Sequence, residues 1–175
     1  MPKWLGGSTL EPDILMPQQE QWKLQWDRVI RWHNRVDRIK KKSQTSELNA
    51  YDIDEVIAFL QNCYHLRDWL QESRPDCRDK VNALFASNFE MTACRDVCNG
   101  FKHKRLQRPS HDAHFNLYRE YEHFADDGSV NPDKYSIAFA DGVDVRKYDL
   151  FDFAECCFRL WESFVSTEVP SAPPT

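Results

Sequence analysis

Apolar residues recur every three or four positions over most of this chain, which is the spacing of one buried face of an α-helix. Stripes of this kind run through five segments, at about 18–42, 52–72, 76–87, 88–103 and 149–166. The period therefore predicts a mainly α protein, a bundle of four to five helices.

Side chains that can cap a helix N-terminus stand before several of these segments. Asp52 or Asp54 is expected to begin the second helix, and Asp149 or Asp152 the last one. Pro75 is expected to end the second helix, because proline cannot donate the backbone hydrogen bond that would continue it.

The region before the last helix has a different pattern. Polar and apolar residues alternate over 113–124, which is typical of a β-strand. Two apolar-rich segments then flank Asp141 and Gly142, and an Asp-Gly pair suits a tight hairpin turn. We predict a small antiparallel β-hairpin or three-stranded sheet, inserted at about 113–147 before the last helix.

The chain length and the positions of its prolines and glycines predict one domain. A chain of 175 residues can bury one substantial core but has no room for two. Prolines and glycines oppose regular structure near both ends. We expect an N-terminal arm at 1–17, a single helical domain at 18–167 and a flexible tail at 168–175.

The charge balance limits the classes of partner. The formal net charge is -5, which argues against a protein that coats nucleic acid or anionic lipid by bulk charge. No run of about 20 apolar residues is present, so no membrane partner is expected and we predict a cytoplasmic protein.

Cations are nevertheless concentrated in the first helical segment. They are Arg28, Arg31, Arg35, Arg38, Lys40, Lys41 and Lys42. This pattern fits either a solvated helix face or a surface that contacts phosphates.

Six cysteines lie within the predicted helices and lack the spacing of a disulfide scaffold. Cys94 and Cys98 are four residues apart, and no second pair completes a zinc site. We predict reduced thiols in the core.

Residues 94–103 concentrate the candidate chemistry. At helical spacing Asp96, Asn99 and His103 share one face, and Arg95 and Lys102 lie beside it. His103 would act as general base or acid, Asn99 and Asp96 would orient it, and Lys102 or Arg95 would contact a phosphate. In RNA cleavage the 2′-hydroxyl can be the nucleophile, so neither a metal nor another cofactor is required.

Neighbouring residues extend this candidate site. Lys104 and Arg105 continue the basic cluster and are predicted to bind substrate. His65 and Asp68, three residues apart on the second helix, would form an opposing supporting wall. Gly100 interrupts the helix at a cost of about 1 kcal/mol relative to alanine, which implies a close backbone approach, a bend or an early helix end.

The pattern Asn99-x-x-x-His103, at the end of a helix and before basic residues, resembles the motif of HEPN domains (higher eukaryotes and prokaryotes nucleotide-binding). Many members of that family are metal-independent ribonucleases of toxin-antitoxin or antiphage defence systems, with an Arg-polar-x-x-x-His motif. Asn99 matches the polar position, whereas Cys98 stands at the arginine position. Arg95, one turn earlier, or Lys102 would have to replace that arginine.

The resemblance covers about residues 18–105 and the last helix, and it does not predict the inserted sheet. It implies a helical domain that acts on RNA. It also implies a homodimer with two motifs at the interface, or a cognate protein partner.

Two other interpretations of these residues stay open. Asp68, Asp96, Asn99 and His103 fit a satisfied hydrogen-bond network that joins two helices in a non-catalytic interaction module. His65, Asp68, Asp96 and His103 are also residue types that facing helices use to bind a divalent transition metal.

Overall fold

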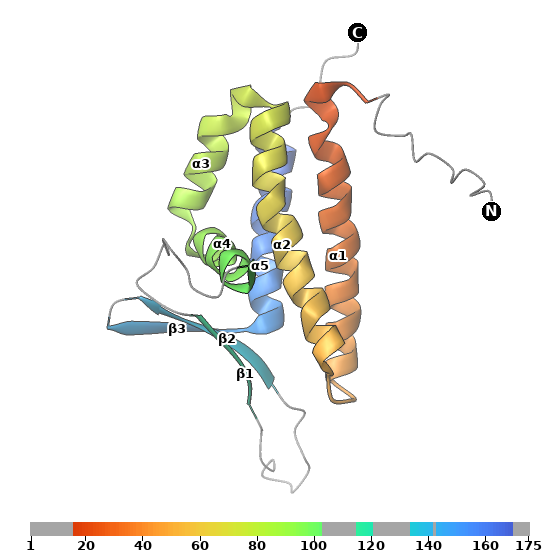
Figure 1. Ribbon diagram of the computed structural model, residues 1–175, viewed down its shortest axis with the longest axis vertical. Coiled ribbons are helices and arrows are strands. Elements are labelled where there is room, and N and C mark those ends of the chain that lie inside the picture. The colour runs from red at the N-terminus through yellow and green to blue at the C-terminus, as the bar shows by residue number, and fades with distance from the viewer. Residues whose placement is uncertain (1–15, 103–114, 121–133, 142, 170–175) are drawn as a thin grey trace, which may run out of the picture.

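A computed structural model describes residues 16–102, 115–120, 134–141 and 143–169 (Figure 1). These residues form five α-helices, which are α1 (Trp22–Ser43), α2 (Ala50–Ser73), α3 (Arg78–Ser87), α4 (Phe89–Lys102) and α5 (Leu150–Glu168). Short 3₁₀ turns precede α1 and α3, at Gln18–Glu20 and Pro75–Cys77. The predicted fold class, mainly α with five helices, is confirmed.

Helix α2 occupies the middle of the bundle and packs against each of the other four helices. In Figure 1 it runs beside α1 and in front of α5, and α3 and α4 lie on its other side. Its large side chains without exposed surface include Phe59, Leu60, Leu66 and Leu70. Because each such burial is worth about 1.5–3 kcal/mol, α2 makes a major contribution to the stability of the bundle.

Asn49 caps the N-terminus of α2. Its side chain accepts a hydrogen bond from the Asp52 backbone N–H at 3.1 Å, and the Asp52 carboxylate accepts one from the Asn49 N–H at 2.8 Å. The prediction that Asp52 or Asp54 begins the helix was therefore wrong by about one turn. Asp52 serves as the third residue of a capping box, a position that the apolar period alone does not reveal.

Asp149 caps α5, which confirms one of the two residues, Asp149 and Asp152, predicted to begin this helix. Its Oδ1 accepts hydrogen bonds from the backbone N–H groups of Phe151, at 2.8 Å, and Asp152, at 3.1 Å. These bonds satisfy two donors that have no partner within the helix.

A three-stranded antiparallel sheet precedes α5, as predicted. Its strands are β1 (Phe115–Glu120), β2 (Lys134–Asp141) and β3 (Asp144–Asp149), and β2 lies in the centre. Ile137 of β2 stands opposite Leu117 and Tyr148 of its two neighbours. The predicted turn residue Gly142 lies outside the described residues.

Aromatic side chains join the sheet to the helices. Phe139 of β2 packs against Phe153 of α5 at 5.2 Å between ring centroids, and against Phe89 of α4 at 5.6 Å. Tyr148 of β3 contacts the same two rings. The sheet and both helices therefore share one hydrophobic core, which extends through the bundle.

None of the helices within the described ranges carries a stretch long and apolar enough to span a bilayer.

Gly100 marks a close approach between α4 and β1, one of the three explanations that the sequence left open. A Cβ at this position would overlap Cε1 of Phe115 and lie 3.0 Å from its Cζ. The Phe115 ring is itself held between Phe101 and Phe139, at centroid distances of 5.7 and 6.4 Å. Glycine at this position therefore allows the strand to contact the helix.

We expect Gly100→Ala to lower the free energy of unfolding by about 1–3 kcal/mol, because the added methyl overpacks this contact. In a Phe115→Ala background the same change should instead raise stability, by about 1 kcal/mol, since only the helix propensity of alanine remains. Urea denaturation of the four proteins of this double-mutant cycle measures the reversal. A stabilising Gly100→Ala with Phe115 intact would contradict the proposed contact.

Candidate functional site

Helix α4, which carries most of the predicted site, is fixed at its first turn by the sheet. The Tyr148 hydroxyl donates a hydrogen bond to the Glu90 carboxylate at 2.9 Å. The Arg146 guanidinium lies 4.3 Å from the centre of the Phe89 ring, in a cation–π contact. Burial and the bond to Glu90 raise the pKa of Tyr148 from 10.0 to about 12, because both favour the neutral phenol.

Asp96 is a charged residue inside the bundle. Only 3% of its surface is exposed, and its Oδ1 lies 3.6 Å from the Arg95 Nε. Arg95 and Asn99 lie half-buried on the same helix. A carboxylate in this position is suited to orient neighbouring groups, since solvent and a large substrate have little access to it.

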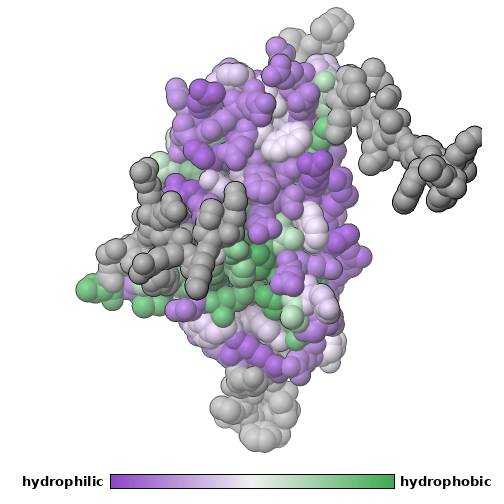
Figure 2. Space-filling view, viewed as in Figure 1, coloured by the Kyte–Doolittle hydropathy of each residue, from purple (hydrophilic) through white to green (hydrophobic). Residues whose placement is uncertain are grey.

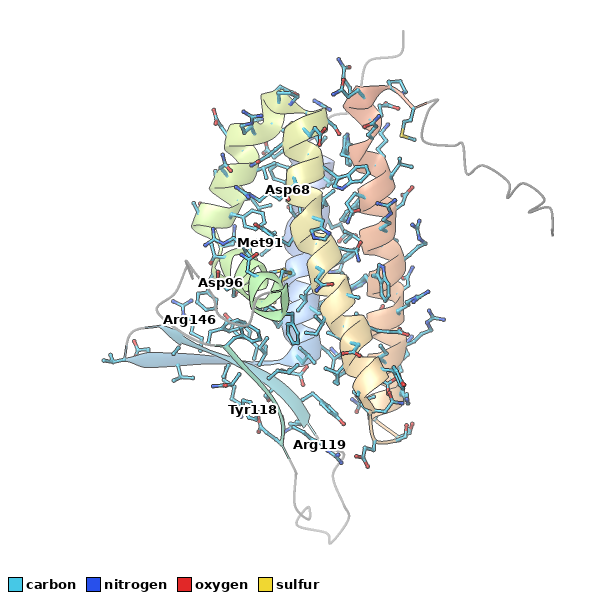
Figure 3. All side chains as sticks on the ribbon, in the orientation of Figure 1. Asp68, Met91, Asp96, Tyr118, Arg119 and Arg146 are labelled. Atoms are coloured by element: carbon cyan, nitrogen blue, oxygen red, sulfur yellow. The ribbon has the colours of Figure 1, made fainter. Side chains whose placement is uncertain are left out.

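The predicted opposing pair on α2 lies at the surface. Asp68 has 62% of its side chain exposed and forms an ion pair with the adjacent Arg67 at 3.8 Å. Figure 3 shows it farther from the sheet than Asp96. His65 is exposed too, but lies close enough to Cys94 of α4 for an electrostatic interaction. Of the pair, His65 is thus the residue that α2 brings near α4.

The remaining predicted site residues cannot be placed in this geometry. His103, Lys104 and Arg105 lie outside the described residues. Lys102 is the last residue of α4, and its side chain is outside the described part as well.

Five of the six thiols lie in the core, as predicted, and the prediction was wrong for Cys156. All six cysteines are free, and five are buried; Cys156 is exposed. Cys94 donates to the Leu60 carbonyl at 3.3 Å, and Cys157 to the Glu90 carbonyl at 3.7 Å. Burial raises the pKa of the Cys157 thiol well above its usual value, so it stays protonated at neutral pH.

The basic residues of α1 differ in their contacts: Lys23 forms an ion pair with Glu20 at 2.8 Å, and Arg28 donates a hydrogen bond to Gln25 at 3.1 Å. Lys40 and Lys42 form ion pairs with Asp152, at 2.9 Å, and Asp52, at 2.6 Å. Four others are exposed, and within the described part of the chain none of them forms an ion pair. These four, named the cationic stripe below, are Arg31, Arg35, Arg38 and Lys41.

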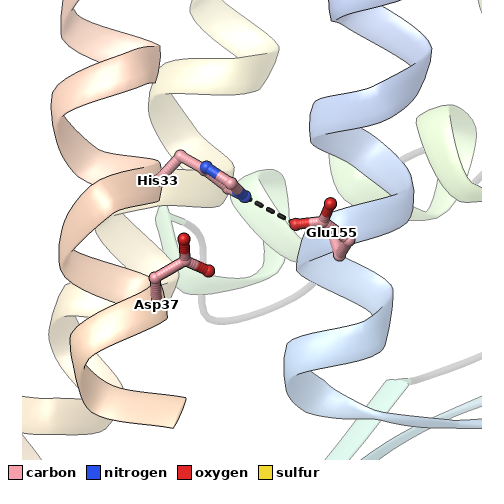
Figure 4. Close-up of side chains that lie close together, drawn as sticks. All are labelled: His33, Asp37 and Glu155. Atoms are coloured by element: carbon pink, nitrogen blue, oxygen red, sulfur yellow. Dashed lines mark hydrogen bonds and ion pairs between the residues drawn. The ribbon is translucent and has the colours of Figure 1, made fainter. Parts of the chain in front are cut away.

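A cluster that the sequence analysis missed joins α1 to α5. His33 Nε2 lies 2.6 Å from Oε2 of Glu155, and Asp37 lies one turn after His33 (Figure 4). One ligand-type atom from each of the three side chains falls within 4.8 Å of the others. The i, i+4 spacing of His33 and Asp37 was visible in the sequence, but their meeting with Glu155 depends on how the helices pack.

Comparison of the chain with protein-family models, curated proteins and solved structures gives no match. The resemblance to HEPN domains therefore rests on Asn99, His103 and the basic residues around them.

We expect Tyr148→Phe to destabilise the protein below pH 10, because the bond that ties β3 to α4 is lost. A raised pKa stabilises the fold below the unfolded value of 10.0 and loses that effect as pH rises through about 12. The difference in melting temperature between wild type and Tyr148→Phe should therefore shrink over this interval. The exposed Tyr51, replaced in the same way, is the control, and a gap for Tyr148→Phe that stays constant to pH 12 would refute the assignment.

Proposed function

We propose that the protein is RNA-directed, and the cationic stripe is the observation that carries the proposal. Its side chains follow one side of α1 at i, i+4, i+7 and i+10, over about 15 Å of helix. The chain has a net charge of -5, so four exposed cations without acidic partners among the described residues are a local concentration against the overall balance. Such an arrangement favours contact with a phosphate backbone.

Two features beside the stripe fit single-stranded RNA. The Arg35 guanidinium lies 4.4 Å from the centre of the Trp32 ring, and such paired planar groups can stack on bases. A pocket of about 410 Å³ opens between α1 and α2, and Arg35, Arg38 and Lys42 line it together with two carboxylates. In the face shown in Figure 2, hydrophilic residues cover most of the surface along α1.

The proposal extends to cleavage through the end of α4. His103 would move the proton of the 2′-hydroxyl, and Asp96 and Asn99 would orient the imidazole of His103. The burial of Asp96 supports an orienting role, and the half-exposed Arg95 could contact a phosphate in place of the missing motif arginine. The activity would be that of a metal-independent ribonuclease of the HEPN type, in a toxin or antiphage system and as a homodimer.

A non-catalytic interaction module is the second candidate. The burial of Asp96 favours it equally, since a buried, paired carboxylate can specify a helix packing without any reaction. In that case a protein partner would take the place of RNA.

Removing two charges of the stripe tests RNA binding. Arg31→Gln with Arg38→Gln should weaken binding of a labelled single-stranded RNA, and should reduce the slope of log K against log salt by about 1.4. Arg78→Gln with Lys80→Gln removes the same charge from exposed positions on α3 and should leave the slope unchanged. Equal losses in both double variants, measured by fluorescence anisotropy, would show that the stripe has no special role.

Cleavage is tested separately, with the same RNA in excess chelator. His103→Ala should lower the cleavage rate by about 10²–10⁴-fold and leave the melting temperature and RNA affinity unchanged. Asp96→Asn should lower the free energy of unfolding by about 1–3 kcal/mol, because a buried charged partner is removed. Lys80→Ala serves as the active control.

The interaction module predicts the opposite pattern. Wild-type protein would then neither bind nor cleave RNA, and His103→Ala would act mainly on the melting temperature.

A further inference from the structure

The cluster of His33, Asp37 and Glu155 has the composition of a metal site built between two helices. His33 and Asp37 are four residues apart on α1, so their side chains leave the same face of that helix. Glu155 approaches from α5. It is the only group of three or more histidine, cysteine or carboxylate side chains with metal-site spacing in the described ranges.

The imidazole of His33 is held in one orientation. Its ring stacks on Phe158 of α5 at 3.7 Å between centroids and at an angle of 6°, and Phe59 of α2 lies at 5.7 Å. Only 8% of the residue is exposed. Nε2 thereby points at Glu155 across the α1–α5 contact, so a ligand nitrogen is already fixed in place.

Glu155 is oriented by a second partner. Arg159 Nε donates to Oε1 of Glu155 at 2.7 Å, which leaves Oε2 directed toward His33. Outer partners of this kind commonly orient the ligands of a metal.

Asp37 is the member of the cluster that takes no part in the ion pair between His33 and Glu155. Its carboxylate points into the space beside the His33–Glu155 contact in Figure 4. Throughout the described residues it forms no hydrogen bond or ion pair, although Lys41 follows it by one turn. Two carboxylates and one imidazole thus converge, and among the described residues only Glu155 has a hydrogen-bond partner outside the cluster, in Arg159.

We propose that His33, Asp37 and Glu155 bind a divalent transition metal, with water in the remaining positions. An ion would replace the proton between His33 Nε2 and Glu155 Oε2, and these atoms would move apart from 2.6 Å to about 3.0–3.4 Å to bind it at about 2.0–2.2 Å. Asp37 needs only a side-chain rotation to approach, because it is tied to nothing else in the described part. One imidazole nitrogen and two carboxylate oxygens suit Zn²⁺ or Mn²⁺ better than the all-oxygen preference of Mg²⁺ or Ca²⁺.

This site lies on α1 and α5. It shares α1 with the cationic stripe but is separate from Asp96 and Asn99, the residues of α4 proposed to take part in cleavage. An ion held here would fasten the two helices together by a contact between residues 118 positions or more apart in the chain.

The test compares metal binding by full-length wild type and Asp37→Asn, each stripped with chelator and then dialysed. With Mn²⁺ as the probe, which binds thiols poorly, wild type should take up one ion per chain and melt at a higher temperature. Asp37→Asn should bind Mn²⁺ at least tenfold more weakly and lose the metal-dependent shift. Its melting temperature without metal should equal that of wild type, because Asp37 has no hydrogen bond or ion pair to lose within the described ranges.

Asp27→Asn, an equivalent change at an exposed position of the same helix, controls for the removed charge and should bind like wild type. Glu155→Gln should also abolish the metal-dependent shift, although it lowers the metal-free melting temperature through the loss of its bonds to His33 and Arg159. The proposal is overturned if wild type takes up no Mn²⁺ and no Zn²⁺. It is equally overturned if Asp37→Asn binds as tightly as wild type.

Discussion

The burial of α2 is the constraint on which the rest of the structure depends. Helix α2 packs against the other four helices, and its buried apolar stripe consists of Val56, Phe59, Leu60, Cys63, Leu66 and Leu70. Two of its polar residues, His65 and Asp68, are exposed. The position of every other helix follows from which part of α2 it covers.

The sheet adds a second constraint, on α4. Tyr148 and Arg146 hold the first turn of α4, and the contact of Gly100 with Phe115 holds its end. Because both contacts come from the same sheet, α4 is fixed along its whole length while Asp96 stays buried between them. A helix restrained at both ends is a suitable support for groups that must keep a fixed orientation, whether for a reaction or for a partner.

Charge is distributed unevenly between the two faces of α1. On the side toward α5, each close contact is balanced: Lys40 meets Asp152, and His33 meets Glu155. On the outer side the cationic stripe has no acidic partner among the described residues. Asp37 lies at the boundary between these faces and is the acidic group for which a bound cation would supply the missing partner.

Local periodicity, turn residues and residue types were enough to predict the helices, the inserted sheet and the free thiols. It missed the first turn of α2, since a capping box at Asn49 extends a helix beyond its apolar stripe. The tertiary structure alone decided which polar residues meet. Asp68 is exposed to solvent, whereas His33 contacts Glu155, which is 122 positions away in the chain. Such meetings depend on the packing of whole helices, and no pattern within one helix specifies them.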